Sequence, residues 1–187
     1  MKNLPNSITF IRIVLTIYLN LYIYLNFGQI IIPVVLTAII FSSDILDGWL
    51  ARKFNAVTTF GVAFDAFADI FYVTLSYLVL CRYHILPFIG ILLIIFKFLE
   101  FLVTSRILQM HRENSEILVF DRVGKMVGII FYILPITTYL FHQTFSEFNH
   151  AIHLAIGVTI GLLGLMVMLS SWDRIGRCRK AMNRPMA

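Results

Sequence analysis

Residues 44–69 of this chain read DILDGWLARKFNAVTTFGVAFDAFAD, and this stretch decides the fold and the chemistry that we expect. It places four carboxylates inside an otherwise highly apolar sequence: Asp44, Asp47, Asp65 and Asp69. The first two end one hydrophobic run, and the last two begin the next. On a helix that turns about 100° per residue, each pair projects from a single face. The short connection lets the two helices return antiparallel, so the pattern predicts that the two acidic faces meet.

Four carboxylates crowded together at a membrane need a cation, because like charges at close range oppose one another's ionisation. Carboxylates inside a membrane are in general a sign of a functional site. Oxygen ligands favour a hard divalent ion, Mg²⁺ or Mn²⁺. The small residues Gly48, Ala51 and Gly61 leave room for a ligand close to the backbone, and Arg52 offers a cation for a phosphate. Together these features indicate a metal-dependent pyrophosphate site.

The spacing D-x2-D-G-x2-A-R-x8-G-x3-D-x3-D resembles the signature of the CDP-alcohol phosphatidyltransferase family. Every defined position is matched, at Asp44, Asp47, Gly48, Ala51, Arg52, Gly61, Asp65 and Asp69. The resemblance covers most of the chain, because the surrounding membrane segments also look like those of the family. It implies an enzyme of phospholipid biosynthesis that transfers a phosphatidyl group from CDP-diacylglycerol to the hydroxyl of a small polar acceptor and releases CMP.

The resemblance also implies roles for individual residues. Two divalent ions would be held by Asp44, Asp47, Asp65 and Asp69, and Asp69 would act as the general base for the acceptor hydroxyl. The residues expected to line the CDP part of the donor are Gly48, Ala51, Arg52, Thr58 and Gly61. A homodimer is a further expectation from the family.

Basic residues expected at the same cavity favour an acceptor that carries its own phosphate. They are Lys125 and Arg106, followed by Arg112 and Arg122. Glycerol 3-phosphate is the leading acceptor, since residues 100–104 and Gly124-Lys125 partly resemble the members that use it. Inositol phosphate, inositol and serine stay open as acceptors.

Three positions differ from the pattern of the glycerophosphate-using members. Those members usually carry a Pro after the third Asp and a Lys after the fourth, where this chain has Ala66 and Ile70. Leu99 replaces the Arg that typically precedes their Glu-Phe pair. These differences affect the expected acceptor and leave the family resemblance intact.

The composition predicts a polytopic membrane protein rather than a soluble one. Of the 187 residues, 59% are hydrophobic and only 13% are charged, against about 25% charged in soluble domains. We expect an all-α integral membrane protein in which one domain, residues 1–187, forms a bundle of six transmembrane helices after a short interfacial segment at 2–8. The expected spans are 9–27, 29–52, 60–83, 86–110, 120–142 and 150–172.

The net charge of +5 does not indicate nucleic acid, because the basic residues sit at helix ends. With six spans, nearly all of them fall on the side of the termini, which places both termini and the four aspartates at the cytoplasmic face of the cell membrane. Asn6, Thr9 and Arg12 fit a family pattern at the entry to the first span, although Arg12 is equally well read as a snorkelling anchor. Lys97 and Glu100 are expected to form an ion pair within the bundle or to border the acceptor.

Three other classes of protein remain as alternatives. A membrane prenyltransferase also holds Mg²⁺ and a pyrophosphate on Asp-rich helices, but its two motifs lie on well-separated helices. A cation transporter would be expected to show internal repeats and broken helices. A purely structural role would not explain the four carboxylates, because the sequence offers too few nearby cations to pair with them. Metal-dependent release of CMP from CDP-diacylglycerol would distinguish a phosphatidyltransferase from all three alternatives.

Overall fold

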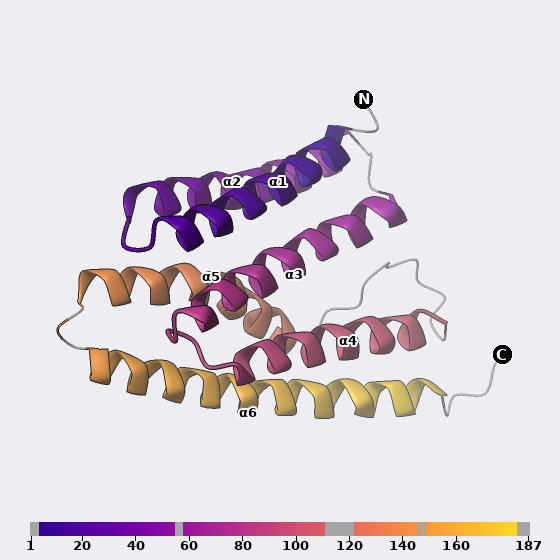
Figure 1. Cartoon of the computed structure of the whole chain (residues 1–187). Helices are drawn as coiled ribbons and strands as arrows, with labels where there is room; N and C mark the ends of the chain where they lie inside the picture. Colours follow the sequence, from indigo (N-terminus) through magenta and orange to yellow (C-terminus); the bar gives the residue numbers. More distant parts are fainter. Residues whose placement is uncertain (1–3, 55–57, 111–121, 146, 148, 183–187) are drawn as a thin grey trace.

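The computed structural model describes residues 4–54, 58–110, 122–145, 147 and 149–182 (Figure 1). Over these residues the chain is helical, as expected. Its helices are α1 (Leu4–Leu25), α2 (Ile31–Lys53), α3 (Thr59–Arg82), α4 (Ile89–Met110), α5 (Arg122–Thr144) and α6 (Asn149–Met182). The first five follow the expected spans closely, whereas α6 continues well beyond the expected end at Trp172.

Five of these helices, α1, α2, α3, α5 and α6, are long and apolar enough to cross a membrane. The helix α4 has a similar length, but it carries Lys97, Glu100 and Arg106. Residues 4–8 belong to the first turns of α1 rather than to a separate interfacial segment. The expectation of a polytopic helical membrane protein is therefore confirmed, while a sixth span through α4 stays a prediction.

The helices pack into two neighbouring groups that share α3 (Figure 1). In the first group, α1 packs against α2 and along α3. In the second group, α4 and α5 each pack against α3 and against α6. Large apolar side chains on the outside, such as Phe10 and Trp172, are strongly exposed. Such a surface suits a lipid solvent, in which the backbone polar groups must be satisfied within each helix.

The end of the bundle that holds the α1–α2 and α3–α4 connections is closed by aromatic contacts. Phe27 stacks on Tyr83 with ring centroids 3.9 Å apart. The Tyr83 hydroxyl donates to the Tyr24 carbonyl at 2.8 Å, and the Tyr139 hydroxyl donates to the Gln29 carbonyl at 2.6 Å. These contacts tie the α1–α2 connection to the end of α3 and to α5.

A buried polar network joins α4 to α6. Lys97 Nζ lies 2.7 Å from Glu100 Oε2 and 2.7 Å from Ser170 Oγ. Arg174 Nε donates to Thr104 Oγ1 at 2.8 Å and lies 3.3 Å from Glu100 Oε1. The expected Lys97–Glu100 ion pair is therefore present, and α6 supplies a second cation to the same carboxylate.

Candidate active site

The site is built where α2 ends and α3 begins. Thr58 caps α3, since its Oγ1 accepts a hydrogen bond from the Gly61 amide at 3.0 Å. A Cβ at Gly61 would lie 3.0 Å from that Thr58 oxygen and 3.2 Å from Asn6 Oδ1. The absence of a side chain at Gly61 thus allows the helix cap and the close approach of α1. This is a structural reason for a glycine here, in addition to its expected role in binding a ligand.

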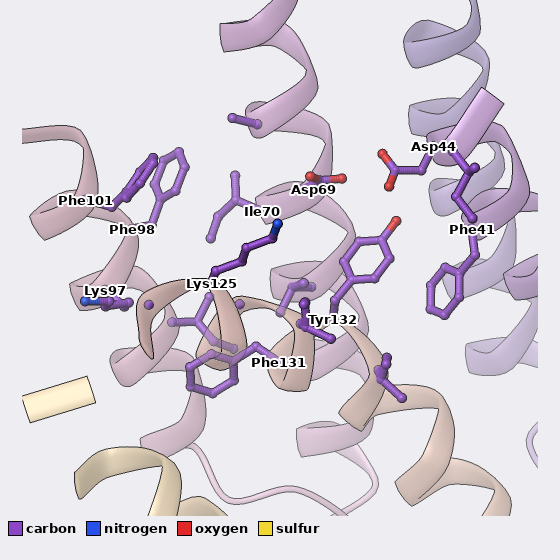
Figure 2. A pocket seen from close by; sticks show the side chains of 18 residues that line it. Phe41, Asp44, Asp69, Ile70, Lys97, Phe98, Phe101, Lys125, Phe131 and Tyr132 are labelled. Carbon is purple, nitrogen blue, oxygen red and sulfur yellow. The ribbon is translucent and has the colours of Figure 1, made fainter. Parts of the chain in front are cut away.

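The structure brings the four aspartates of the motif together. Asp44 and Asp47 project from α2, and Asp65 and Asp69 from α3. One carboxylate oxygen from each of Asp44, Asp47 and Asp65 lies within 4.8 Å of the others. Figure 2 shows Asp44 and Asp69 facing each other from the two helices. The two acidic faces therefore meet, as the helical period and the short connection between α2 and α3 predict.

The centre of this acidic cluster is occupied by the guanidinium of Arg12 from α1. Its Nη1 lies 2.7 Å from Asp44 Oδ1 and 2.9 Å from Asp69 Oδ1. Its Nη2 lies 2.8 Å from Asp65 Oδ1 and also contacts Asp47 Oδ2. Arg12 is fully buried, so it is not a snorkelling anchor. A third helix thus contributes to the site.

The charge of the cluster and its donor atoms fit a hard divalent cation. Four carboxylates face one guanidinium, and among the side chains that the structure describes Arg12 is the only cation within ion-pair distance of them. The carboxyl groups of the cluster thus outnumber this cation by three, and carboxylates in an apolar surrounding are costly without a positive partner. All of the donors are oxygens, which Mg²⁺ and Mn²⁺ prefer. These residues could hold such ions.

A cavity of about 480 Å³ opens beside Asp44 and Asp69, between α2, α3, α4 and α5 (Figure 2). Most of its wall is apolar. The polar groups on its wall are Asp44, Asp69, Lys97, Lys125 and Tyr132. The amino group of Lys97 is turned toward α6, whereas that of Lys125 points toward Asp69. Lys125 is thus the described cation that the cavity offers to a ligand.

The other residues expected at the site differ in where they lie. Arg106 is exposed on α4 and does not line the cavity, so the structure does not bring it to the site. Gly48 follows Asp47 on α2. Arg112 lies outside the described residues, and so do the side chains of Ala51, Arg52 and Arg122.

Two residues of the site were not assigned to it from the sequence alone, Arg12 and Tyr132. Arg12 comes from another part of the chain, and its only signal was the Asn6, Thr9, Arg12 pattern. The Thr9 hydroxyl donates to Asp47 Oδ2 at 3.3 Å, so this part of α1 contacts the site in two places. Tyr132 lies two helical turns after Lys125, a spacing that places both on one face of α5.

Fold and site together define a helical membrane protein with an acidic centre suited to divalent cations. The chain belongs to the CDP-alcohol phosphatidyltransferase family, whose model matches residues 2–170. This agrees with the resemblance seen in residues 44–69.

Several relatives carry the name CDP-diacylglycerol–glycerol-3-phosphate 3-phosphatidyltransferase. The one from Bacillus subtilis is 32% identical over 139 residues, which cover 67% of this chain and 70% of the relative. The one from Rickettsia typhi is 41% identical over 75 residues, or 37% of this chain and 39% of the relative. The Rickettsia felis protein is 40% identical over 74 residues. The chain thus matches well under half the length of the Rickettsia relatives, while the Bacillus subtilis match is more extensive.

Proposed function

We propose that this protein transfers a phosphatidyl group from CDP-diacylglycerol to glycerol 3-phosphate and releases CMP. The observation that carries the proposal is the convergence of four carboxylates from α2 and α3 beside a cavity into which the amino group of Lys125 points. Family membership and the names of the relatives support the same reaction. They favour it over a prenyltransferase, a cation transporter or a purely structural protein.

In this proposal Asp44, Asp47, Asp65 and Asp69 hold Mg²⁺ or Mn²⁺, with two ions expected. When bound, such ions neutralise a pyrophosphate and stabilise its departing oxygen. Asp69 accepts the proton of the acceptor hydroxyl. The hydroxyl oxygen forms a bond to the lipid-side phosphorus while the bond from that phosphorus to the CMP oxygen breaks, so phosphatidylglycerol phosphate and CMP are the products.

Lys125 is the residue that we assign to the phosphate of the acceptor, because its amino group points into the cavity toward Asp69. Ala66 and Ile70 also line the cavity. Two of the three positions where this chain differs from glycerophosphate-using members are therefore at the cavity wall, whereas Leu99 is exposed on α4. Because the wall lacks a second cation at position 70, inositol phosphate, inositol and serine have to be tested beside glycerol 3-phosphate.

The nucleotide part of CDP-diacylglycerol is proposed to lie near Gly48, Ala51, Arg52, Thr58 and Gly61. Its acyl chains would remain in the bilayer. We also propose that the site faces the cytoplasm, on the basis of the family and of the charge bias of the sequence. A homodimer is proposed on the basis of the family alone.

An acceptor panel with purified protein tests this function. Glycerol 3-phosphate, inositol phosphate, inositol and serine are each supplied with CDP-diacylglycerol and Mg²⁺ or Mn²⁺, and the lipid product is identified by mass. We expect CMP release with glycerol 3-phosphate and its loss when EDTA removes the metal. Release of CMP only with another acceptor would replace the proposed acceptor, and no release with any of them would contradict the transferase reaction.

Asp69→Asn tests the assignment of the base. The amide cannot accept the proton of the acceptor, but it keeps nearly the same shape, so turnover should be abolished while binding of CDP-diacylglycerol is largely kept. Proton transfer by a positioned side chain contributes about 100- to 10,000-fold to a rate. Asp173→Asn, at an exposed position on α6, is the control and should retain full activity. An active Asp69→Asn enzyme would show that another group takes the proton.

A further inference from the structure

Tyr132 of α5 lies between the two helices that carry the carboxylates. Its ring stacks on Phe41 of α2, with centroids 4.7 Å apart, and packs against Tyr72 of α3, with centroids 4.8 Å apart. Phe41 stands about one helical turn before Asp44, and Tyr72 stands about one turn after Asp69. The ring is therefore held one turn deeper in the bundle than both of these acidic residues.

The hydroxyl of Tyr132 has no hydrogen-bond partner among the residues that the structure describes, although its oxygen is buried. A buried tyrosine hydroxyl usually finds a partner, because leaving it without one is unfavourable. In Figure 2 this hydroxyl points toward Asp44 and Asp69, and Tyr132 forms part of the cavity wall. The missing partner is therefore expected on the side of the carboxylates and the cavity, where a substrate would lie.

We infer that the Tyr132 hydroxyl donates a hydrogen bond to a phosphoryl oxygen on the lipid-side phosphate of the donor. The inference rests on the proposed function. The carboxylates define the level of the diphosphate, and Tyr132 lies on its bilayer side, from which the lipid portion of the donor enters. No covalent bond to Tyr132 forms or breaks in this role.

A neutral phenol suits this position better than another charged group. It adds no negative charge beside four carboxylates, and it keeps its ring within the apolar contacts with Phe41 and Tyr72. A hydrogen bond to a phosphoryl oxygen strengthens as negative charge builds on that oxygen in the transition state. Loss of the hydroxyl should therefore lower kcat more than it changes KM.

Tyr77 provides a matched control on α3. Its hydroxyl is also buried, and no side chain or backbone group in the described part of the chain pairs with it. It lies in the core instead, where its ring would be 2.8 Å from a Cβ built on Gly90, and it does not line the cavity. Tyr77→Phe and Tyr132→Phe remove the same atom from two buried tyrosines, of which only one faces the carboxylates.

The first measurement compares the two variants with the wild type, using CDP-diacylglycerol and glycerol 3-phosphate. Tyr132→Phe should lower kcat about 10- to 100-fold, the effect of one hydrogen bond to a charged oxygen, with both KM values nearly unchanged. Tyr77→Phe should keep the kcat of the wild type. Thermal unfolding of Tyr132→Phe should occur at or above the wild-type temperature, because no described residue forms a hydrogen bond with this hydroxyl.

The second measurement uses a donor in which sulfur replaces one non-bridging oxygen on the lipid-side phosphorus. Sulfur is a weaker hydrogen-bond acceptor. For one of the two diastereomers, the difference in kcat between wild type and Tyr132→Phe should therefore largely disappear. A packing defect would lower the rate with every donor equally.

Three outcomes would overturn the inference. If the wild type turns over and Tyr132→Phe has the same kcat, the hydroxyl has no part in the reaction. If Tyr132→Phe raises only the KM for glycerol 3-phosphate, the hydroxyl contacts the acceptor instead of the donor. If the wild type releases no CMP with any acceptor, the proposed function and this inference fail together.

Discussion

At the scale of single residues, Arg12 supplies the positive charge that stabilises the four clustered aspartates when no metal is bound. It is completely buried and lies within ion-pair distance of all four aspartates. Removing one partner from a buried set of charges leaves the other charges unpaired in a medium of low dielectric constant. The same positive charge also competes with any divalent cation that enters the cluster.

Arg12→Gln should therefore change stability and metal binding in opposite directions. Without metal, the loss of the guanidinium should destabilise the protein by about 3–5 kcal/mol. Mn²⁺ should then raise the unfolding temperature of the variant more than that of the wild type, because binding to the folded state adds stability and four carboxylates attract the ion without a competing charge. Thermal unfolding in EDTA and in a Mn²⁺ titration measures both effects.

Arg82→Gln is the control for this change, since Arg82 is exposed at the opposite end of α3. It should behave like the wild type in EDTA and in Mn²⁺. An Arg12→Gln protein that Mn²⁺ stabilises no more than the wild type would show that Arg12 does not compete with the ion.

At the scale of helices, the network between α4 and α6 explains how α4 keeps its charges within an apolar bundle. Glu100 lies between Lys97 of its own helix and Arg174 of α6, and Ser170 of α6 accepts from Lys97. Arg174 also donates to Thr104 and to Ser105. Charges inside a membrane are tolerated when they pair with one another in the bundle interior. Lys97, Glu100 and Thr104 of α4 thus form a polar contact with α6.

Glu100→Gln should destabilise the packing of α6 on α4. The change leaves two buried cations without their carboxylate, which costs about 3–5 kcal/mol for a buried ion pair. Unfolding in detergent measures the loss. The exposed pair of Asp173 and Arg177 on α6 is the matched control, because breaking it by Asp173→Asn should cost about 0–1 kcal/mol. Equal effects of the two substitutions would contradict a structural role for the network.

At the scale of the whole molecule, the helices begin and end at two opposite ends of the bundle, and the acidic site lies at one of them. The beginning of α1 and the ends of α2 and α6 lie at the end of the bundle that holds the acidic site (Figure 1). Basic residues are concentrated in the adjoining sequence, including Lys2, Lys53 and the segment from Arg174 to Arg184. Positive charge near the ends of spans favours the cytoplasmic side.

A reporter that is active only outside the cytoplasm should therefore be inactive when it is fused after Ala187. The same reporter fused into the α3–α4 connection, after His84, should be active, because this connection lies at the other end of the bundle (Figure 1). Reporter activity in cells measures both fusions. The reverse pattern would place the acidic site on the outer face of the membrane.

Local features of the sequence were enough to predict the helices and the meeting of the acidic faces. Apolar runs of about 20 residues are long enough for membrane helices. The spacing of Asp44 to Asp47 and of Asp65 to Asp69 orients each pair by the helical period alone, and a short connection brings the two helices together. Each of these steps depends on residues that are close in the chain.

The partners of those aspartates were decided only by the tertiary structure. Arg12 enters the cluster from α1. Likewise, Tyr132 joins the wall of the adjoining cavity from α5, and Arg174 reaches Glu100 from α6. Lys125 lines the cavity while Arg106 does not, although the sequence alone made both residues leading candidates for binding the acceptor. The physical reason is that helices distant in sequence meet through their packing, and the period of one helix does not specify which face of another helix lies against it.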